Sequence, residues 1–411
     1  MRRFALFSLL LYPGISPAQG NLFDYYHETV QSPVQSWVLD VENDAFRDSD
    51  RYYTNGIRYS RYYSGKDKIT FNGQIAMTVD DDGNLTTVDG VQGPTRTENR
   101  SSDCQRQNNS AYEFYYLAHN TDCYIDGDKV DLYKHYAGWL VANVMYTPKD
   151  ITAKFEEFEQ YDRPYAGYTY FGRFVETVHA DDSLTRYEIQ GGLLGKASAT
   201  QAIQRTWHDI FGFDRPEWEK QIESELALQV NILHRFAVPS FLKWELNKRT
   251  NTRLFDVQPY VFGEAGTVFV RASVGIDVRV GLMQGLISGP RGASPIGSIQ
   301  KILSVPGAKS AYDNSQCVLK YFCVPESGYL FGKIEETGVL RNSTIQGGMF
   351  TDSEYTQDFR SRVRTMALGL KIYWTNWGIS FSWKNRSPEV AGVPFDSGYH
   401  RWAELQVTRS L

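Results

Sequence analysis

The sequence predicts an all-β protein: a twelve-stranded antiparallel transmembrane up-and-down β-barrel with long periplasmic insertions. Three observations predict this fold. Segments of about ten residues or more alternate between apolar and polar side chains, their apolar faces carry aromatic residues near the ends, and their polar faces bear full charges. A soluble β-sandwich also alternates, so the length of the segments and the charges on their polar faces decide between the two classes.

Composition excludes several other classes. The chain has 411 residues, of which 14% are aromatic, and this content argues against a disordered protein. Apart from the first twenty residues, no stretch approaches the ~18 apolar residues of a membrane-spanning helix. The formal net charge is −5 and no basic block is present, which argues against a nucleic-acid partner.

The N-terminus has the pattern of an export signal. Two arginines precede the apolar run Phe4–Tyr12, and small residues at 16–18 offer a cleavage site. We therefore expect a signal peptide at residues 1–18, an N-terminal periplasmic segment at 19–36 and the barrel at 37–411.

The barrel strands follow in order along the chain. In the clearest of them every second residue from Val268 to Val280 is apolar, whereas the other parity includes Arg271, Asp277 and Arg279. The expected strands are 37–42, 54–63, 136–146, 168–178, 185–194, 226–235, 255–265, 268–281, 329–340, 364–374, 378–385 and 399–411.

An even number of strands places both termini on the periplasmic side. Connections from odd to even strands then face outward, and connections from even to odd strands face the periplasm. The two longest connections, 64–135 and 282–328, are of the second kind, so we expect them to be periplasmic insertions. Both are polar, and ordinary long loops remain an alternative reading of them.

Four cysteines in an exported chain fit two disulfides. Three pairings are possible, and we favour the local ones, Cys104 with Cys123 and Cys317 with Cys323. Each local pair lies within one insertion, in an oxidising compartment. A metal site at these cysteines is less expected, because no Cys-x-x-Cys or nearby histidine pattern accompanies them.

The first outward loop carries acidic and amide residues. Strand parity places Asp40, Glu42 and Asp44 inside the barrel on the first strand, and Thr54 inside on the second, so Asp44 and Thr54 should meet at one rim. A carboxylate with nearby carbonyl and hydroxyl oxygens is a plausible Ca²⁺ site. The alternative is that Asn, Asp and Gly merely form the turn.

The third outward loop contains a histidine in a helix-like segment with acidic neighbours. The imidazole of His208, partnered by a carboxylate, could deprotonate water for ester hydrolysis, and Asp214 lies six residues further on. A surface histidine without a role is the alternative. The chain has no Gly-x-Ser-x-Gly motif, which argues against a serine nucleophile.

Taken in order, these motifs resemble the outer-membrane lipid A 3′-O-deacylase family, of which LpxR is the type. The resemblance extends from Val41 to the last strand. Its marks are Glu42-Asn43-Asp44-Ala45-Phe46, Asp50-Arg51-Tyr52-Tyr53-Thr54-Asn55-Gly56, Tyr146-Thr147-Pro148, Asp162-Arg163-Pro164-Tyr165-Ala166-Gly167 and the segment from Gln204 to Trp218.

The resemblance implies a carboxylic ester hydrolase that removes the 3′-linked acyl group of lipid A with Ca²⁺ as cofactor. Its partner would be lipopolysaccharide in the outer leaflet of the bacterial outer membrane, its site would lie between the barrel wall and that leaflet, and we expect a monomer. By motif, His208 is similar to the general base, and Asn43, Asp44 and Thr54 to the residues that arrange cation and oxyanion, with Asp44 as metal ligand.

Two positions depart from the family pattern. Asp214 stands where the family has a longer Glu after the histidine, and the basic pair that holds the substrate has no clear match. Lys154 is the candidate for substrate binding in that loop. The missing basic pair bears on the choice of substrate more than on the type of reaction.

Two other functions stay open. Inward charges such as Arg271, Asp277, Arg279 and Lys371 could line a wet channel, as in a small pore or a binding barrel, although a twelve-stranded interior is narrow enough for complementary charges to fill it. A phospholipase that acts on another acyl ester is the second alternative.

Overall fold

The computed structural model describes the segments 34–44, 52–64, 68–71, 74–79, 85–87, 124–125, 128–129, 131–152, 162–179, 183–247, 252–284, 317–319, 322–323, 327–373, 377–394 and 399–410. Within them, no helix has the length and apolar character needed to cross a membrane.

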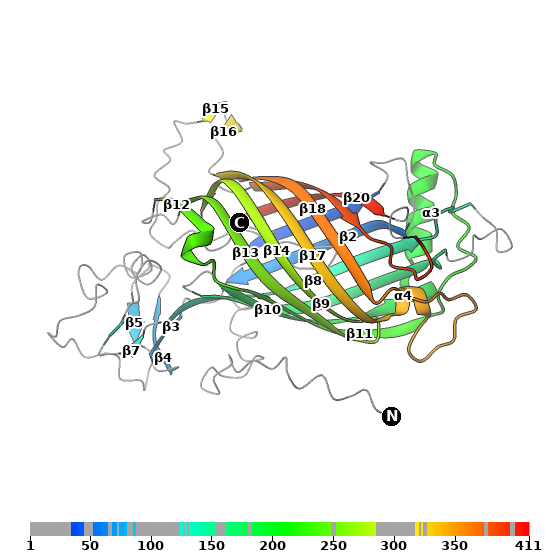
Figure 1. Ribbon diagram of the computed structural model, residues 1–411, viewed down its shortest axis with the longest axis horizontal. Helices are drawn as coiled ribbons and strands as arrows, with labels where there is room; N and C mark the ends of the chain where they lie inside the picture. Colours follow the sequence, from blue (N-terminus) through cyan, green and yellow to red (C-terminus); the bar gives the residue numbers. More distant parts are fainter. Residues whose placement is uncertain are drawn as a thin grey trace.

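Twelve antiparallel strands close into a barrel (Figure 1). They are β1 (Val34–Asn43), β2 (Tyr52–Ser64), β8 (Asp131–Thr147), β9 (Ala166–His179), β10 (Leu184–Leu194), β11 (Glu225–Arg235), β13 (Thr252–Gly266), β14 (Phe269–Gln284), β17 (Ser327–Asn342), β18 (Arg362–Tyr373), β19 (Trp377–Arg386) and β20 (His400–Ser410). Each strand pairs with the barrel strands before and after it in the chain, and β1–β20 pairing joins the first to the last. The expected up-and-down barrel of twelve strands is therefore confirmed.

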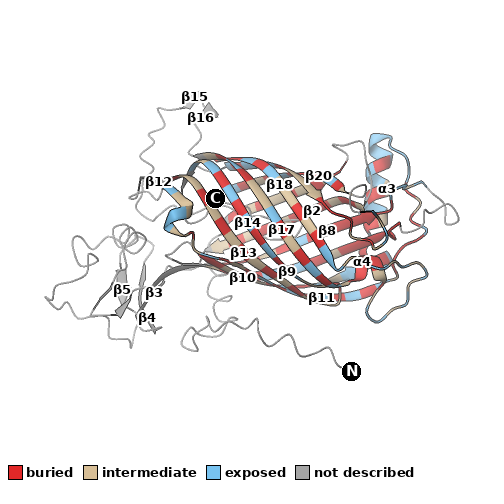
Figure 2. Cartoon of the chain, viewed as in Figure 1, coloured by how far each residue is buried: buried red, intermediate tan, exposed pale blue. Residues whose placement is uncertain are grey.

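Burial alternates along the strands, as Figure 2 shows in red and pale blue. On β11, Leu226 and Leu228 are 77% and 65% exposed, whereas Gln229 is 1% exposed. The apolar residues thus face outward and the polar residues fill the interior, the reverse of a soluble barrel. The expected inward positions agree, because Asp40, Glu42, Asp44 and Thr54 are all buried.

Complementary charges fill the interior. Glu188 accepts from Arg58 at 3.1 Å and from Arg186 at 2.5 Å, and Lys384 bridges Glu42 and Glu404. Further buried pairs are Arg235–Asp277, Arg253–Asp256, Arg279–Asp256, Arg271–Glu264 and Lys333–Glu335. A buried charge is tolerated when it is paired and hydrogen-bonded, so these side chains form a polar core across the lumen.

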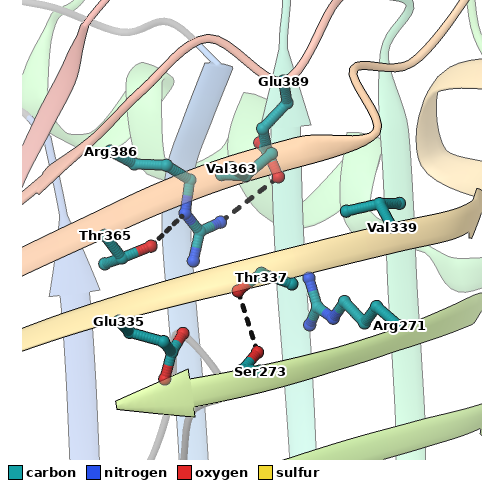
Figure 3. Close-up of a pocket in the computed structure, with 9 residues that line it drawn as sticks. All are labelled: Arg271, Ser273, Glu335, Thr337, Val339, Val363, Thr365, Arg386 and Glu389. Carbon is teal, nitrogen blue, oxygen red and sulfur yellow. Dashed lines mark hydrogen bonds and ion pairs between the residues drawn. The ribbon is translucent and has the colours of Figure 1, made fainter. Parts of the chain in front are cut away.

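One small cavity remains in this core. Figure 3 shows it between Arg271 and Arg386, with Ser273 donating to or accepting from Thr337 at 2.8 Å and Arg386 Nε donating to Thr365 at 3.2 Å. Glu389 lies above it and pairs with Arg386 at 3.4 Å. The described interior thus holds a small pocket lined mostly by charged and polar groups, and the charges expected to fill a narrow lumen do so.

Loops pack against one another at one end of the barrel. This end carries α3 (Thr200–Phe211) and α4 (Ser343–Gln346). Arg163 links three of these loops, because its guanidinium group forms an ion pair with Glu389 at 3.3 Å and donates a hydrogen bond to Thr344 at 2.9 Å. The main-chain N–H of Arg360 donates to the Glu389 carbonyl at 2.6 Å. Burial raises the pKa of the Glu389 carboxyl, but the guanidinium groups of Arg386 and Arg163 lower it further, so the net pKa lies below the usual value.

The opposite end, at which β1 begins and β20 ends, carries additional strands. β3 (Lys68–Phe71), β4 (Gln74–Val79) and β5 (Leu85–Thr87) belong to the first insertion and extend the sheet from β8. Lys68 pairs with Tyr133, and for this reason β8 begins at Asp131 rather than at residue 136. The first insertion is thus partly sheet and not only an ordinary long loop.

The remaining small elements lie in the connections. They are β6 (Tyr124–Ile125), β7 (Asp128–Lys129), η6 (Gly195–Ser198), η7 (Ser240–Leu242), β12 (Lys243–Asn247), β15 (Cys317–Leu319) and β16 (Phe322–Cys323). β15 pairs with β16 so that Cys317 lies directly opposite Cys323 in the strand register. Cys104, Cys123, the signal peptide and the segment 19–33 lie outside the described residues. Both disulfides therefore stay predictions.

Candidate active site at the α3 end of the barrel

The helix α3 lies against the outer face of the barrel wall. Thr200, Gln204 and His208 are buried at intervals of four residues, so they form one buried stripe on the helix, and Thr200 at its start contacts the wall. At its N-terminal end, Asn143 Nδ2 of β8 donates to Thr200 Oγ1 at 2.8 Å and to Thr169 Oγ1 of β9 at 2.6 Å. These bonds fix where the helix leaves the wall.

A glycine allows this close approach. A Cβ atom at Gly167 of β9 would lie 2.2 Å from Ser198 Oγ and 2.3 Å from Thr200 Oγ1, where ordinary contacts begin at 3.4 Å. Only a residue without a side chain fits between the wall and the start of α3. This explains the glycine that ends the Asp162–Gly167 motif.

His208 is held by the chain that follows α3. Gly212 ends the helix in the left-handed conformation (φ 71°), and the N–H of Phe213 donates to the His208 carbonyl at 3.0 Å. This turn brings the main-chain carbonyl of Asp214 to 2.5 Å from His208 Nδ1. A carbonyl can only accept, so Nδ1 carries the proton of the neutral imidazole and Nε2 is the basic nitrogen.

The expected contact between His208 and Asp214 therefore exists, but it uses the main chain. The Asp214 side chain itself is exposed. The reason is the length of the connection, because a turn of five residues after His208 returns the backbone, and not the carboxylate, to the imidazole.

A second contact fixes the segment after the helix. Trp218 Nε1 donates to Gln204 Oε1 at 2.7 Å, and its ring stacks on Tyr165 with centroids 4.7 Å apart. Trp218, Tyr165 and Met145 of β8 form a buried apolar cluster. The cluster joins the wall, the Asp162–Gly167 motif and the His208 segment into one packed unit.

The other face of α3 is apolar and exposed. Trp207 is 50% exposed and Ile210 69% exposed, and Ile203, Phe211 and Phe213 are also exposed. The neighbouring wall presents the exposed residues Val141 of β8 and Phe171 of β9. A helix with one buried polar stripe and one exposed apolar face is suited to lie in the interface of a bilayer.

Asp44 and Thr54 meet at the same end of the barrel, as expected. The N–H of Asp44 donates to the Thr54 carbonyl at 3.1 Å, and the Thr54 hydroxyl lies 2.5 Å from the Thr147 hydroxyl. All three side chains are buried. Asn43, the Cα partner of Asn55, is half-buried and follows the outward parity of β1.

The chemistry of these donors fits a hard cation, because carboxylate, hydroxyl and carbonyl oxygens are the ligands that Ca²⁺ prefers. In the described segments, however, no group of three or more His, Cys, Asp or Glu side chains could hold a metal ion. Ligands in addition to Asp44 would therefore be neutral oxygens. Lys154 lies outside the described residues, so its expected role stays a prediction.

Asn143 and Thr169 were missed by the sequence reasoning. Both are polar residues at the outward parity of their strands, where Val141 and Phe171 face the membrane. A polar residue on an otherwise apolar face indicates that another element covers it, and this signal was available in the sequence. Thr147 was present in a recognised motif but was not assigned to the site.

The family model and one solved structure agree with this architecture. A family model described as "Outer membrane protein LpxR" matches residues 4–411. Among solved structures, LpxR from Salmonella typhimurium aligns with a TM-score of 0.57 and 15% identity, covering 92% of this chain and 100% of that chain. The β domain of the Bordetella autotransporter BrkA aligns with a TM-score of 0.34 and 6% identity over 92% of this chain and 98% of that chain. No curated protein is a significant sequence match.

Proposed function

Because the chain belongs to the family of the outer-membrane protein LpxR, we propose that it is an outer-membrane esterase that removes the 3′-linked acyl group of lipid A. The observation that carries this proposal is the His208 imidazole, which is buried on α3 and bonded through Nδ1 to the Asp214 carbonyl. Such a bond leaves Nε2 as the proton acceptor, which is what a general base requires.

In the proposed reaction, His208 Nε2 takes a proton from a water molecule as that water attacks the ester carbonyl. The C–O bond to the sugar then breaks, and the imidazolium returns its proton to the departing 3′-oxygen. The Asp214 carbonyl stabilises the imidazolium through the Nδ1 hydrogen bond and keeps the ring oriented throughout.

The negative charge that develops on the ester oxygen needs stabilisation. We assign this task to the rim where Asn43, Asp44 and Thr54 lie, with Asp44 as the acidic ligand of a Ca²⁺ ion. When bound there, the ion would supply Lewis-acid stabilisation of the oxyanion. Asn43 would donate its amide N–H to the same oxygen.

A lipid substrate suits the surroundings of this histidine. The apolar face of α3 and the wall residues Val141 and Phe171 of β8 and β9, the strands that contact the helix, are exposed and could receive acyl chains. We further propose that Lys154, in the loop before the Asp162–Gly167 motif, binds an anionic group of the lipid A head. The charge-filled and capped lumen argues for catalysis at the rim of the barrel rather than deep inside it.

The test is mass spectrometry of lipid A from Gram-negative cells that express the wild type, His208→Ala or the matched control His234→Ala. His234 lies on β11 and its ring bonds to Thr185 at 2.9 Å, away from α3. We expect loss of the 3′-linked acyl mass with the wild type and His234→Ala, and unchanged lipid A with His208→Ala. Full activity of a folded His208→Ala barrel would remove this histidine from the mechanism.

The same preparation distinguishes the related alternatives. Purified wild type is offered lipid A or phospholipid, each with Ca²⁺ or with EDTA. Hydrolysis of lipid A that requires Ca²⁺ supports the proposal, whereas hydrolysis of phospholipid alone would replace the substrate, and equal rates in EDTA would discard the metal.

A further inference from the structure

The outer wall of six adjacent strands carries a row in which tryptophan and arginine alternate. Each member is the Cα partner of the next in the strand register. The row, which we call the Trp–Arg row, consists of Trp377 of β19, Arg409 of β20, Trp37 of β1, Arg61 of β2, Trp139 of β8 and Arg173 of β9. Three guanidinium groups and three indoles therefore lie side by side on the membrane-facing wall.

The row faces outward. Trp377 is 42% exposed, Arg409 and Arg173 are exposed, and the other three members are half-buried. At one end of the row the side chains contact one another, because the Arg409 guanidinium lies 5.0 Å from the centre of the Trp377 ring and the Trp37 and Trp377 rings meet edge to face at 5.9 Å. Arg61 Nε donates to the Tyr59 hydroxyl at 2.8 Å.

The row lies toward the end of the barrel at which β1 begins and β20 ends. Trp377 is the first residue of β19, and Arg409 is the residue before the end of β20. In an up-and-down barrel of the outer membrane both termini lie on the periplasmic side. The Trp377 end of the row is therefore near the periplasmic leaflet, on the side opposite to α3. Because the strands are tilted, register partners differ in depth, and the row rises toward the bilayer centre as it continues to Arg173 of β9.

The row also shortens the apolar band on this wall. On β2 the outward positions between Asn55 and Arg61 are Ile57 and Tyr59, so the polar residues are separated by about 20 Å along the strand and about 15 Å along the membrane normal. On the opposite wall every outward residue of β14 from Ala272 to Leu282 is apolar, which corresponds to about 25 Å along the normal.

A guanidinium at the depth of hydrocarbon is costly unless it reaches a polar partner. Arg61 already donates to the Tyr59 hydroxyl through Nε. Long arginine side chains extend toward the interface, where the phosphate of a phospholipid can accept paired hydrogen bonds from the guanidinium group. Indole rings favour the same headgroup level. The charge and spacing of the row thus complement phosphate headgroups and not acyl chains.

We propose that the Trp–Arg row is a binding site for the phosphate headgroups of phospholipids in the periplasmic leaflet. Phosphates bind between neighbouring arginines, flanked by the indoles, and hold the leaflet closer to the bilayer centre along β19, β20, β1, β2, β8 and β9. The bilayer is then thinner on this wall than beside β14. The inference is independent of the esterase reaction.

Native mass spectrometry of the full-length barrel in detergent tests the proposal. The wild type is mixed with dioleoyl phosphatidylglycerol, or with dioleoylglycerol, which has the same chains and no phosphate. The same mixtures are measured with the triple variant Arg61→Gln, Arg173→Gln, Arg409→Gln. The matched control is Arg401→Gln, an exposed arginine at the other end of β20.

We expect the wild type and Arg401→Gln to retain phosphatidylglycerol and release dioleoylglycerol, and the triple variant to retain roughly tenfold less phosphatidylglycerol. Equal retention by the triple variant, or equal retention of the two lipids by the wild type, would overturn the proposal. The proposal would also be overturned if the wild type preferred lipid A to phosphatidylglycerol and the triple variant lost that preference. If the triple variant does not fold, each single variant should show a partial loss, and no loss in any of them counts against the site.

Discussion

Replacing Gly167 by alanine should disable the proposed site without unfolding the barrel. The added Cβ would lie 2.2 Å from Ser198 Oγ, 2.3 Å from Thr200 Oγ1 and 2.5 Å from Thr200 Cβ. Ordinary contact starts at 3.4 Å, so the first turn of α3 must move away from β9 by about 1.2 Å. Asn143 would then lose its bond to Thr200, which is 2.8 Å long in the native structure.

The expected result is a large loss of activity, because His208 is on the same helix as the displaced turn. A misplacement of about 1 Å in a catalytic group costs on the order of a hundredfold in rate, which corresponds to about 2.7 kcal/mol of transition-state stabilisation. The barrel strands themselves are not disturbed, so heat-modifiable migration on gels should be unchanged.

The assay is the initial rate of acyl release from lipid A by purified protein, measured by mass spectrometry. Gly263→Ala is the matched control: the same substitution on a barrel strand, at a position where a Cβ would have no atom within 4 Å. We expect the control to keep the wild-type rate. Wild-type activity of a folded Gly167→Ala protein would refute the reasoning, because it would mean that seating α3 on the wall does not position the base.

Three further predictions follow from the described contacts. Asp214→Ala should keep most of the activity, since the acceptor for His208 is a main-chain carbonyl; a rate loss near that of His208→Ala would show that the carboxylate is required. Planar bilayers with the purified barrel should show no stable open-channel conductance, because ion pairs fill the lumen, and steady porin-like currents would support the pore alternative. Peptide mapping without reduction should recover Cys317 linked to Cys323 and Cys104 linked to Cys123, and recovery of free or crossed thiols would contradict this pairing.

The strands and their two faces were predictable because a side-chain period of two is a direct property of the extended backbone. The segment Val268–Val280 shows this best, since every second residue is apolar and the other parity carries Arg271, Ser273, Asp277 and Arg279. The same parity correctly placed Asp44 and Thr54 together. The alternation of side chains was enough to place these two residues, because they lie at the adjoining ends of β1 and β2, which pair in the sheet.

Other features could not be predicted in this way. The sequence pattern indicated that Asp214 partners His208 but not which of its atoms does so, since that depends on the φ of 71° at Gly212 and the turn it begins. The pairing of β3 with β8 depends on contacts between distant segments. The cap formed by Arg163, Thr344 and Glu389 joins three loops that no periodic pattern connects.

The exposed apolar face of α3 also determines how the rate of the proposed reaction would have to be measured. A lipid that is confined to a leaflet reaches Trp207 and Phe211 by lateral diffusion in two dimensions and not from bulk solution. The quantity that sets its rate of encounter is then its mole fraction in the surface. Adding inert detergent at constant total lipid should slow turnover by dilution within the micelle, so rates for this barrel are comparable only at equal surface composition.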